Sequence, residues 1–263
     1  MEDLYESFFR YFEIVRADKP ELLDAAYRMR YEVYCKENAY EDASGCPDQR
    51  ERDEFDDFSV HTLVRHRRTG HFAGVVRLVL PRRDSTQPLF PTDIHVEHRY
   101  IKSQYSMFGQ GRDKTAEISR LAVSPEFKRR IAEHGTLAGV SGNASYGNGH
   151  HLGAFDRRLL PHITLGLFAG IVQMSAEYGI THWLALMEPT LMRFLMRFGI
   201  QFRAVGPLVS YHGTRQPAIA DASEVLEAIH QRRRDVWDIL TMKGTVWPLT
   251  AVRHESNGAH GGV

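Results

Sequence analysis

The pattern of hydrophobic and polar positions in the first forty residues predicts a strand followed by a helix. Residues 12–17 (FEIVRA) form a short apolar run that is typical of a strand. Residues 18–21 (DKPE) follow, and their capping aspartate, early proline and acidic first turn are typical of a helix start. Apolar residues then recur at helical spacing from Leu22 to Val33. We therefore expect an amphipathic helix that ends near Asn38.

Further strands are predicted in the middle of the chain. Residues 61–66 and 72–80 are β-rich runs on either side of the turn sequence RRTG at 67–70, which indicates a hairpin that Pro81 ends. Residues 116–123 (AEISRLAV) show another strand pattern. Strict alternation along this strand predicts two faces, one with Glu117, Ser119, Leu121 and Val123 and the other with Ile118, Arg120 and Ala122.

The second half of the chain alternates helices and strands. Residues 82–114 show no regular period, and residues 131–160 contain six glycines, which predicts a mobile insertion or lid. The later predictions are a helix at 162–178, a strand at 181–187, a helix at 189–198, a strand at 201–209 and a terminal helix from a capping Asp221. We expect an α/β fold with a mixed central sheet flanked by helices. It would form one domain over residues 1–253, followed by a disordered tail at 254–263.

Composition and charge exclude some classes of protein. The chain has 263 residues, of which 43% are hydrophobic, with 33 basic and 33 acidic side chains. A net charge of zero argues against a protein whose whole surface binds nucleic acid or anionic lipid, because those partners select for a basic excess. The charges are unevenly placed, however, since residues 1–60 carry 8 basic and 17 acidic side chains and residues 61–134 carry 14 and 7. We interpret the first region as suited to a cationic amine and the second to an acidic partner.

Other sequence signals favour a cytoplasmic protein without a metal. No signal peptide pattern is present at the start, and no stretch approaches the length of a membrane span. Cys35 and Cys46 lack zinc or redox spacing, so we expect two reduced thiols, with Cys35 a partly buried helix residue rather than a nucleophile. His150, His151 and His162 have no Cys or Asp at ligand spacing, so we predict no metal site.

Ordered motifs in the chain resemble a family of acyltransferases. Motifs similar to the acyl-homoserine-lactone synthases and the long-chain N-acyl amino acid synthases are RYEVY (30–34), ERDEFDDFS (51–59), AGVVRLVLP (73–81) and EISRLAV (117–123). The later run at 197–220 resembles the PEP-CTERM/exosortase system-associated acyltransferases. The resemblance spans residues 12–220 and implies the GNAT fold of the acyl-CoA N-acyltransferases.

The resemblance also implies which residues surround the substrates. At matching positions these are Glu51, Asp53, Asp56, Arg77, Glu117 and Arg120. We add Ser119, which shares the predicted strand face of Glu117. The usual acetyl-CoA signature, Arg/Gln-x-x-Gly-x-Gly/Ala, is replaced by RRIAEHGTLAG at 129–139. That replacement disfavours a CoA pyrophosphate cradle at a helix N-terminus and favours a donor that a protein carries.

Acyl transfer from a thioester to an amine needs a base for the amine proton and donors for the developing oxyanion. Glu117 is the expected base, and Arg120 would keep neighbouring acids ionised. The fold resemblance implies that backbone N–H groups hold the oxyanion where the strand splays after Leu121. Two interpretations exist for Tyr211–His212: the pair protonates the leaving thiolate, or it only ends a strand.

Arg77 lies in the middle of an apolar strand, where an unpaired buried charge would be costly. We expect an acidic partner among Asp53, Asp56 and Glu117. Two interpretations of the charged set are open. In one, the set is only an ion-pair network that ties the acidic loop to the sheet. In the other, Asp53 and Arg77 hold the site together while Glu117 and Asp56 face the amine.

Basic residues after the strand ends predict a docking surface for an acidic carrier protein. These carrier-binding residues are Arg82, Arg83, Lys128, Arg129 and Arg130. A solvated basic face without a partner is the alternative. A second group of large apolar residues either lines an acyl tunnel or belongs to the core, and its members are Phe127, Leu165, Phe168, Met174, Met187, Met192 and Phe194.

These observations predict an N-acyltransferase that acts between acyl carrier protein and a small amine. It would move a medium- or long-chain fatty acyl group from the acyl-phosphopantetheine thioester to the amino group of an amino acid, giving an N-acyl amino acid. We expect no other cofactor, no nucleic acid and no integral membrane contact, although the product would partition into membranes. The alternatives are an acyl-homoserine-lactone synthase that uses S-adenosylmethionine, an acetyl-CoA-dependent acetyltransferase, and a non-catalytic acyl-carrier-binding module.

Overall fold

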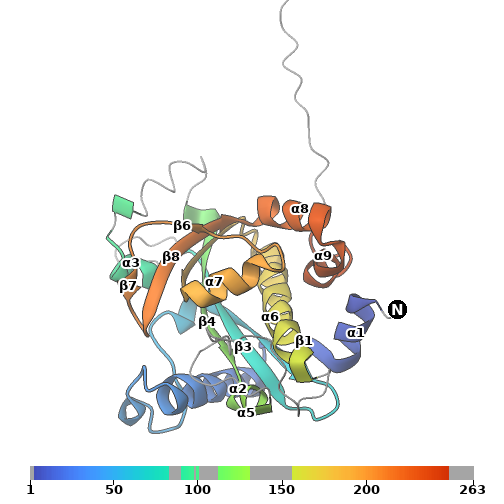
Figure 1. The fold of residues 1–263 in the computed structure, drawn as a ribbon. Helices are drawn as coiled ribbons and strands as arrows, with labels where there is room; N and C mark the ends of the chain where they lie inside the picture. Colours follow the sequence, from blue (N-terminus) through green and yellow to red (C-terminus); the bar gives the residue numbers. More distant parts are fainter. Residues whose placement is uncertain (1–2, 83–89, 98, 101–111, 131–155, 249–263) are drawn as a thin grey trace, which may run out of the picture.

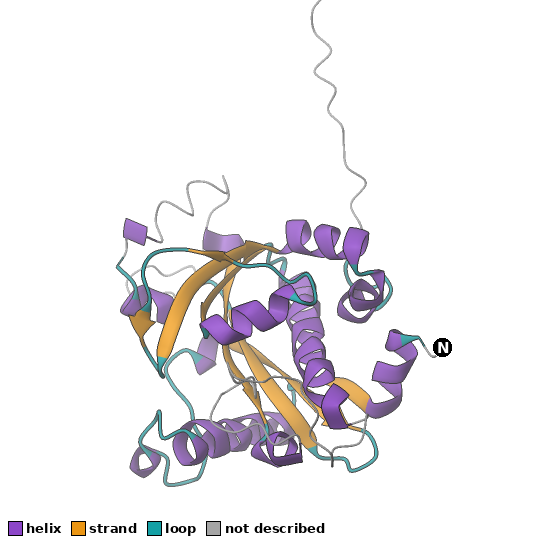
Figure 2. Ribbon diagram, in the orientation of Figure 1, coloured by secondary structure: helices purple, strands orange, loops and turns teal. Residues whose placement is uncertain are grey.

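The structure is a computed structural model, and it describes residues 3–82, 90–97, 99–100, 112–130 and 156–248. These residues form a mixed β-sheet with helices on both faces (Figures 1 and 2). The α-helices are α1 Leu4–Tyr11, α2 Pro20–Arg30, α3 Pro91–His95, α5 Pro125–Arg130, α6 Asp156–Tyr178, α7 Pro189–Met196, α8 Ala222–Arg232 and α9 Arg234–Thr241. The strands are β1 Phe12–Arg16, β2 Ser59–His66, β3 Phe72–Val79, β4 Thr115–Val123, β5 His182–Met187, β6 Arg203–Ala204, β7 Val209–Ser210 and β8 Thr214–Asp221. A π-helix η1 covers Tyr31–Glu37, and short 3-10 turns are η2 Ala43–Gly45, η3 Asp56–Phe58 and η4 Arg112–Lys114.

The sheet has the strand order β1-β2-β3-β4-β5-β8-β6, and β7 pairs with β8. β4 and β5 run parallel, whereas the other neighbouring strands run antiparallel. α2 packs against β2, β3 and β4 on one face, and α6 crosses β1 to β4 on the other. Figure 1 shows α7, α8 and α9 on the α6 side. The predicted mixed sheet flanked by helices is confirmed.

The predicted strand, first helix and hairpin are present in the first half of the chain. α2 begins at Pro20 after Lys19, which makes no side-chain cap, so the expected capping role of Asp18 is wrong. The fixed backbone of proline is enough to start the helix there. Beyond Arg30 the helix widens into η1 and closes at Asn38, as predicted. A helix before the first strand, α1, was not predicted.

The predictions for the Gly-rich insertion and the last elements need correction. α6 begins at Asp156, so residues 156–160 belong to a helix, whereas 131–155 lie outside the described residues. The single strand predicted at 201–209 is replaced by β6 and β7, which have two residues each. β8 was not predicted. The terminal helix is capped by Asp221 as expected, but it breaks at Arg233 into α8 and α9.

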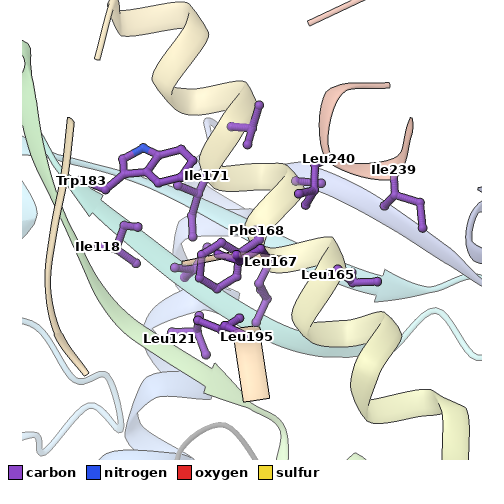
Figure 3. Packing of buried hydrophobic residues seen from close by; sticks show 14 of the residues in the cluster. Ile118, Leu121, Leu165, Leu167, Phe168, Ile171, Trp183, Leu195, Ile239 and Leu240 are labelled. Atoms are coloured by element: carbon purple, nitrogen blue, oxygen red, sulfur yellow. The ribbon is translucent and has the colours of Figure 1, made fainter. Parts of the chain in front are cut away.

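The main core lies between the sheet and α6, with α1, α7, α8 and α9 around it. Figure 3 shows Ile118 and Leu121 of β4 directed toward Phe168 of α6. Trp183 of β5 is also buried in this core, and its indole N–H donates to Ser175 Oγ at 2.9 Å. No helix in the described parts of the chain is long and apolar enough to cross a membrane.

Gly170 lets α6 lie directly on β2. A Cβ added at this position would stand 2.7 Å from Thr62 Cβ, closer than real contacts allow. We expect Gly170→Ala to lower the free energy of unfolding by about 1–3 kcal/mol, because the added methyl group overpacks the contact with β2. The higher helix propensity of alanine acts in the opposite direction and is the smaller effect. Urea denaturation measures the effect. The matched control is Gly45→Ala, because an added Cβ there meets nothing within 4 Å. Equal midpoints for the two variants would show that α6 can move away from β2 without cost.

Candidate active site

A pocket opens where β4 and β5 part. The two parallel strands pair over residues 115–118 and 182–185, and both continue beyond that point. The sequence interpretation placed this opening after Leu121, but the pairing ends three residues earlier, at Ile118. The pocket contains about 650 Å³ of unfilled space, including its open mouth. Main-chain groups of β4 and β5 beyond Ile118 and Ala185 therefore do not pair with each other.

A bulge at Arg120 changes the faces of β4. Arg120 has a φ of 48°, and the pairing with β3 shifts register opposite it. Ile118 and Leu121 consequently both pack in the core on the α6 side, while Ala122 packs with the cluster under α2. The strict alternation predicted from the sequence is therefore wrong beyond Ser119. The bulge places Arg120 beside Ser119 on the side of the acidic loop, which alternation would not allow.

Arg30 lies at the centre of a buried ion-pair network behind the pocket. Its Nε donates to Glu51 Oε2 at 2.6 Å. Its Nη1 and Nη2 donate to the two carboxylate oxygens of Asp56 at 2.6 and 2.9 Å. His61 Nε2 lies 3.2 Å from the same carboxylate. Arg30 was not among the predicted site residues, although it is the first residue of the RYEVY motif.

Arg77 joins the network from β3. Its Nη1 lies 2.5 Å from Asp53 Oδ1 and 3.0 Å from Asp56 Oδ1, and its Nε donates to Ser119 Oγ at 2.9 Å. The expectation that this buried arginine has an acidic partner is confirmed. Asp53 and Asp56 are the partners, an arrangement that both interpretations of the charged set allow.

Arg120 connects the network to the pocket. Its Nη2 lies 2.9 Å from both Glu51 Oε1 and Asp53 Oδ2, and 3.1 Å from Glu41 Oε1. Its Nη1 donates to the hydroxyl of Tyr211 at 3.0 Å. Arg120 lines the pocket, whereas the acids that bind it from the loop do not. The arginine therefore forms the pocket wall, and the carboxylates stand behind it.

The network holds its acids in the charged form. Burial alone would raise the pKa of Glu51, but the charges of Arg30 and Arg120 hold it at about 2. For Asp56, hydrogen bonding from His61 and the charge of Arg30 likewise outweigh burial and lower the pKa far below its usual range. Burial lowers the pKa of His61 to about 4, so this histidine is neutral at neutral pH. Asp56 is thus engaged with its partners and does not face the pocket, contrary to the prediction that it faces the amine.

Glu117 is the carboxyl group of β4 that lines the pocket. It is 1% exposed, and its Oε2 accepts a hydrogen bond from the backbone N–H of Thr92 at 2.9 Å. Burial raises the pKa of Glu117 to about 8, although the contact with Thr92 opposes the shift. A carboxylate of this basicity is suited to accept a proton from an amine near neutral pH. The candidate base predicted from the sequence therefore lies in a pocket and has a perturbed pKa.

Tyr211 and His212 form the opposite wall of the pocket. They occupy the turn between β7 and β8, so they do end a strand, and both also line the pocket. The ring of Tyr211 stacks on His95 with 3.8 Å between centroids, and His212 Nε2 lies 2.8 Å from Glu41 Oε1. Burial raises the pKa of Tyr211, despite the positive charge of Arg120. Its hydroxyl is therefore protonated at neutral pH.

The pocket crosses the sheet and has two different ends. On the side of the acidic loop it is lined by polar groups, namely Glu117, Ser119, Arg120, Glu188, Tyr211, His212 and Arg215. On the side of α6 it is lined by the apolar residues Ile118, Leu121, Phe168, Met187 and Leu191. Of the apolar residues considered for an acyl tunnel, Phe168 and Met187 lie on the wall. Phe127, Leu165, Met174 and Phe194 belong to the buried core, and Met192 packs against it.

Of the basic residues predicted to bind a carrier protein, the structure describes the side chains of Lys128 and Arg82. Lys128 is fully buried, and its Nζ lies 2.5 Å from Glu37 Oε2, so it is not on a surface that a carrier could contact. Burial lowers the pKa of Lys128, while Glu37 opposes that shift. Arg82 follows β3 and stacks over the ring of Phe58 at 4.4 Å. Arg83 and the side chains of 129–130 lie outside the described residues.

Covalent and metal chemistry receive no support from the described side chains. Cys35 and Cys46 are free, and burial together with the nearby Cys46 thiol raises the pKa of Cys35 to about 12, which makes it a poor nucleophile. Among the residues with described positions, no group of three His, Cys, Asp or Glu side chains is placed to hold a metal ion. His150 and His151 lie outside that set.

Comparisons with known proteins place this fold among solved structures. Residues 29–137 match the family described as an acetyltransferase (GNAT) domain, and they include the acidic loop and β2 to β4. TofI, solved with an inhibitor and MTA, has a TM-score of 0.50 and 19% identity, covering 83% of this chain and 96% of TofI. The AHL synthase LasI has a TM-score of 0.50 and 16% identity, covering 84% and 94%. BjaI, a CoA-dependent acyl-homoserine lactone synthase solved with SAM and isopentyl-CoA, has a TM-score of 0.50 and 18% identity, covering 88% and 99%. No protein of curated function matches the chain.

These comparisons concern two expectations. The likeness to the three solved structures confirms the expected GNAT-like fold over most of the chain. The family match is to an acetyltransferase domain and supports the expected enzyme class; it includes the acidic loop and β4 but not β5 or the turn with Tyr211 and His212.

Proposed function

We propose that this GNAT-type N-acyltransferase moves a medium- or long-chain fatty acyl group from a carrier-bound thioester to the amino group of an amino acid. The observation that supports this function is the pocket through the split sheet. Its apolar end on the α6 side suits an acyl chain, and its polar end beside Glu117 suits an amine. An acetyl group would leave the apolar end unfilled.

In the proposed reaction, the amine nitrogen attacks the thioester carbonyl at the point where β4 and β5 part. Glu117 accepts the amine proton as the C–N bond forms. Main-chain N–H groups at the split stabilise the oxyanion. The C–S bond then breaks, and Tyr211 protonates the leaving thiolate. Arg120, whose Nη1 lies 3.0 Å from the Tyr211 hydroxyl, offsets part of the cost of the negative charge left there. Solvent then returns a proton to Tyr211 and takes the proton from Glu117.

Mass spectrometry of lipid extracts from cells that express the chain tests this function. We expect new N-acyl amino acids that carry medium- or long-chain acyl groups. With purified protein, acyl-acyl carrier protein and acyl-CoA are offered separately, because BjaI is CoA-dependent. Release of a homoserine lactone, or of acetyl amides alone, would replace the proposal by one of those activities. Carrier binding without turnover on any amine would identify a binding module.

A further inference from the structure

Glu188 and Arg215 form an ion pair on the polar wall of the pocket that none of the above steps uses. β5 and β8 pair as far as Met187 opposite Gln216, so the next residues, Glu188 and Arg215, stand opposite each other. Arg215 Nη1 lies 3.0 Å from Glu188 Oε1, and their side chains are 5% and 14% exposed. Strand alternation places Glu188 on the same sheet face as Leu184, which pairs with Glu117. The ion pair and the base therefore share one side of the sheet.

Arg120 and Arg215 both line the pocket, but they differ in how many of their N–H donors are already used. Arg120 already contacts three carboxylates and a phenol. Among the described side chains, the carboxylate in contact with Arg215 is that of Glu188, and Arg215 Nη2 also donates to the backbone carbonyl of His212. A guanidinium has five N–H donors, so Arg215 keeps donors for another carboxylate. Tyr40 covers the guanidinium at 5.9 Å and limits its motion.

We propose that Arg215 and Glu188 recognise the zwitterionic head group of an α-amino acid acceptor. The acceptor carboxylate binds Arg215, and Glu188 attracts the ammonium group while it repels anions that lack one. An amine without a carboxylate gains nothing from Arg215, and a carboxylate without an amine is opposed by Glu188. The inference rests on the proposed function, because it specifies which residues of the same pocket hold the amino acid acceptor.

The test compares three acceptors that differ in one group. They are the best acceptor among the twenty L-amino acids, its carboxamide, and the amine that lacks the carboxyl group. We expect wild-type protein to prefer the amino acid. Arg215→Lys retains the charge beside Glu188 but loses the planar fork, so kcat/KM for the amino acid is expected to fall about 10–100-fold, mainly through KM, as for loss of a charged hydrogen bond. The values for the carboxamide and the amine should change less than about threefold.

The matched control is Arg203→Lys, on the exposed strand β6 that also pairs with β8. It should leave all three acceptors unchanged, and melting curves establish that both variants are folded. The inference is wrong if wild-type protein uses the carboxamide as well as the amino acid. It is equally wrong if Arg215→Lys lowers kcat/KM for all three acceptors by the same factor.

A binding measurement keeps the inference separate from the proposed reaction. If no acyl amide forms with any donor, the proposed function fails, but recognition of the head group is still measurable. The twenty L-amino acids are then tested one at a time at saturating concentration. At least one is expected to raise the melting temperature of the wild-type protein and not of Arg215→Lys. No shift in the wild-type protein, or the same shift in both proteins, overturns the inference whatever the outcome for catalysis.

Discussion

Replacing Glu117 by glutamine is expected to lower kcat for acyl transfer by about 10²–10⁴-fold, the range that a positioned general base contributes. Glutamine has the shape of the native side chain and cannot accept the amine proton. Its carbonyl oxygen can still accept the hydrogen bond from the backbone N–H of Thr92, which Glu117 Oε2 accepts at 2.9 Å. The rate of amide formation is measured by mass spectrometry. Glu126→Gln is the control, because Glu126 pairs with His71 at a distance from the pocket.

The pH dependence of activity and of stability separates a catalytic role from a structural one. Because burial raises the pKa of Glu117 to about 8, kcat of the wild-type protein should rise with pH and level off above that value. In the unfolded chain Glu117 ionises near the ordinary glutamate pKa of 4.5. Between the two values the folded state binds more protons, so this group makes the free energy of unfolding decrease as pH rises through that window.

The glutamine variant lacks this titration, so its stability relative to wild type should increase between pH 4.5 and 8. Urea denaturation at several pH values measures the change. A variant that is inactive and also less stable across the whole range would assign Glu117 a structural role. An unchanged rate in a folded variant would remove it as the base.

Periodic elements could be predicted from the sequence because each carries its own local signal. The hairpin of β2 and β3, the strand β5 and the long apolar helix α6 are examples. β8 was missed because its sequence, TRQPAIAD, has a proline and polar residues within the strand, and its place in the sheet depends on pairing with β5. The bulge at Arg120 was missed for a similar reason. Nothing in EISRLAV marks a left-handed residue, so the face change after Ser119 becomes visible only when the neighbouring strand and helices are placed.

The sequence predicted which residue types form the charged site, but not which of them line the pocket. Two arginines, Arg77 and Arg120, and the acidic loop could be identified as partners, since buried charges need compensation. Which groups line the pocket and which stand behind it depends on contacts between residues far apart in sequence. Arg120 and Glu51 are 69 residues apart, and Arg120 and Tyr211 are 91 apart. Arg30 was missed because charged neighbours on the same helix, Arg28 and Glu32, give no sign of which charge is buried. Glu188 and Arg215 were missed because only the strand register brings them together.

Removal of Arg30 is expected to have the largest effect on stability. Arg30→Met replaces the guanidinium by an apolar chain of similar length and leaves Glu51 and Asp56 buried with fewer partners. Loss of one partner from a buried charge network costs about 3–5 kcal/mol. Arg28→Met is the matched control on the same helix, because Arg28 pairs with Asp24 at 2.7 Å in solvent and its loss should cost at most about 1 kcal/mol. Urea denaturation is the suitable measurement, since guanidinium salts would screen the charges.

The pH dependence of the Arg30→Met effect identifies its cause. The pKa values of Glu51 and Asp56 are lowered in the folded protein, in part by Arg30, so the stability they contribute is present above their unfolded values and is lost as pH falls through their folded values. The difference between wild type and Arg30→Met should therefore be largest near pH 7 and shrink toward pH 3. A difference that stays constant with pH would attribute the effect to lost packing.

If Arg30→Met unfolds at the same urea concentration as Arg28→Met, the network does not hold the acidic loop to the sheet. The wall that Arg120 forms must then be positioned by other contacts.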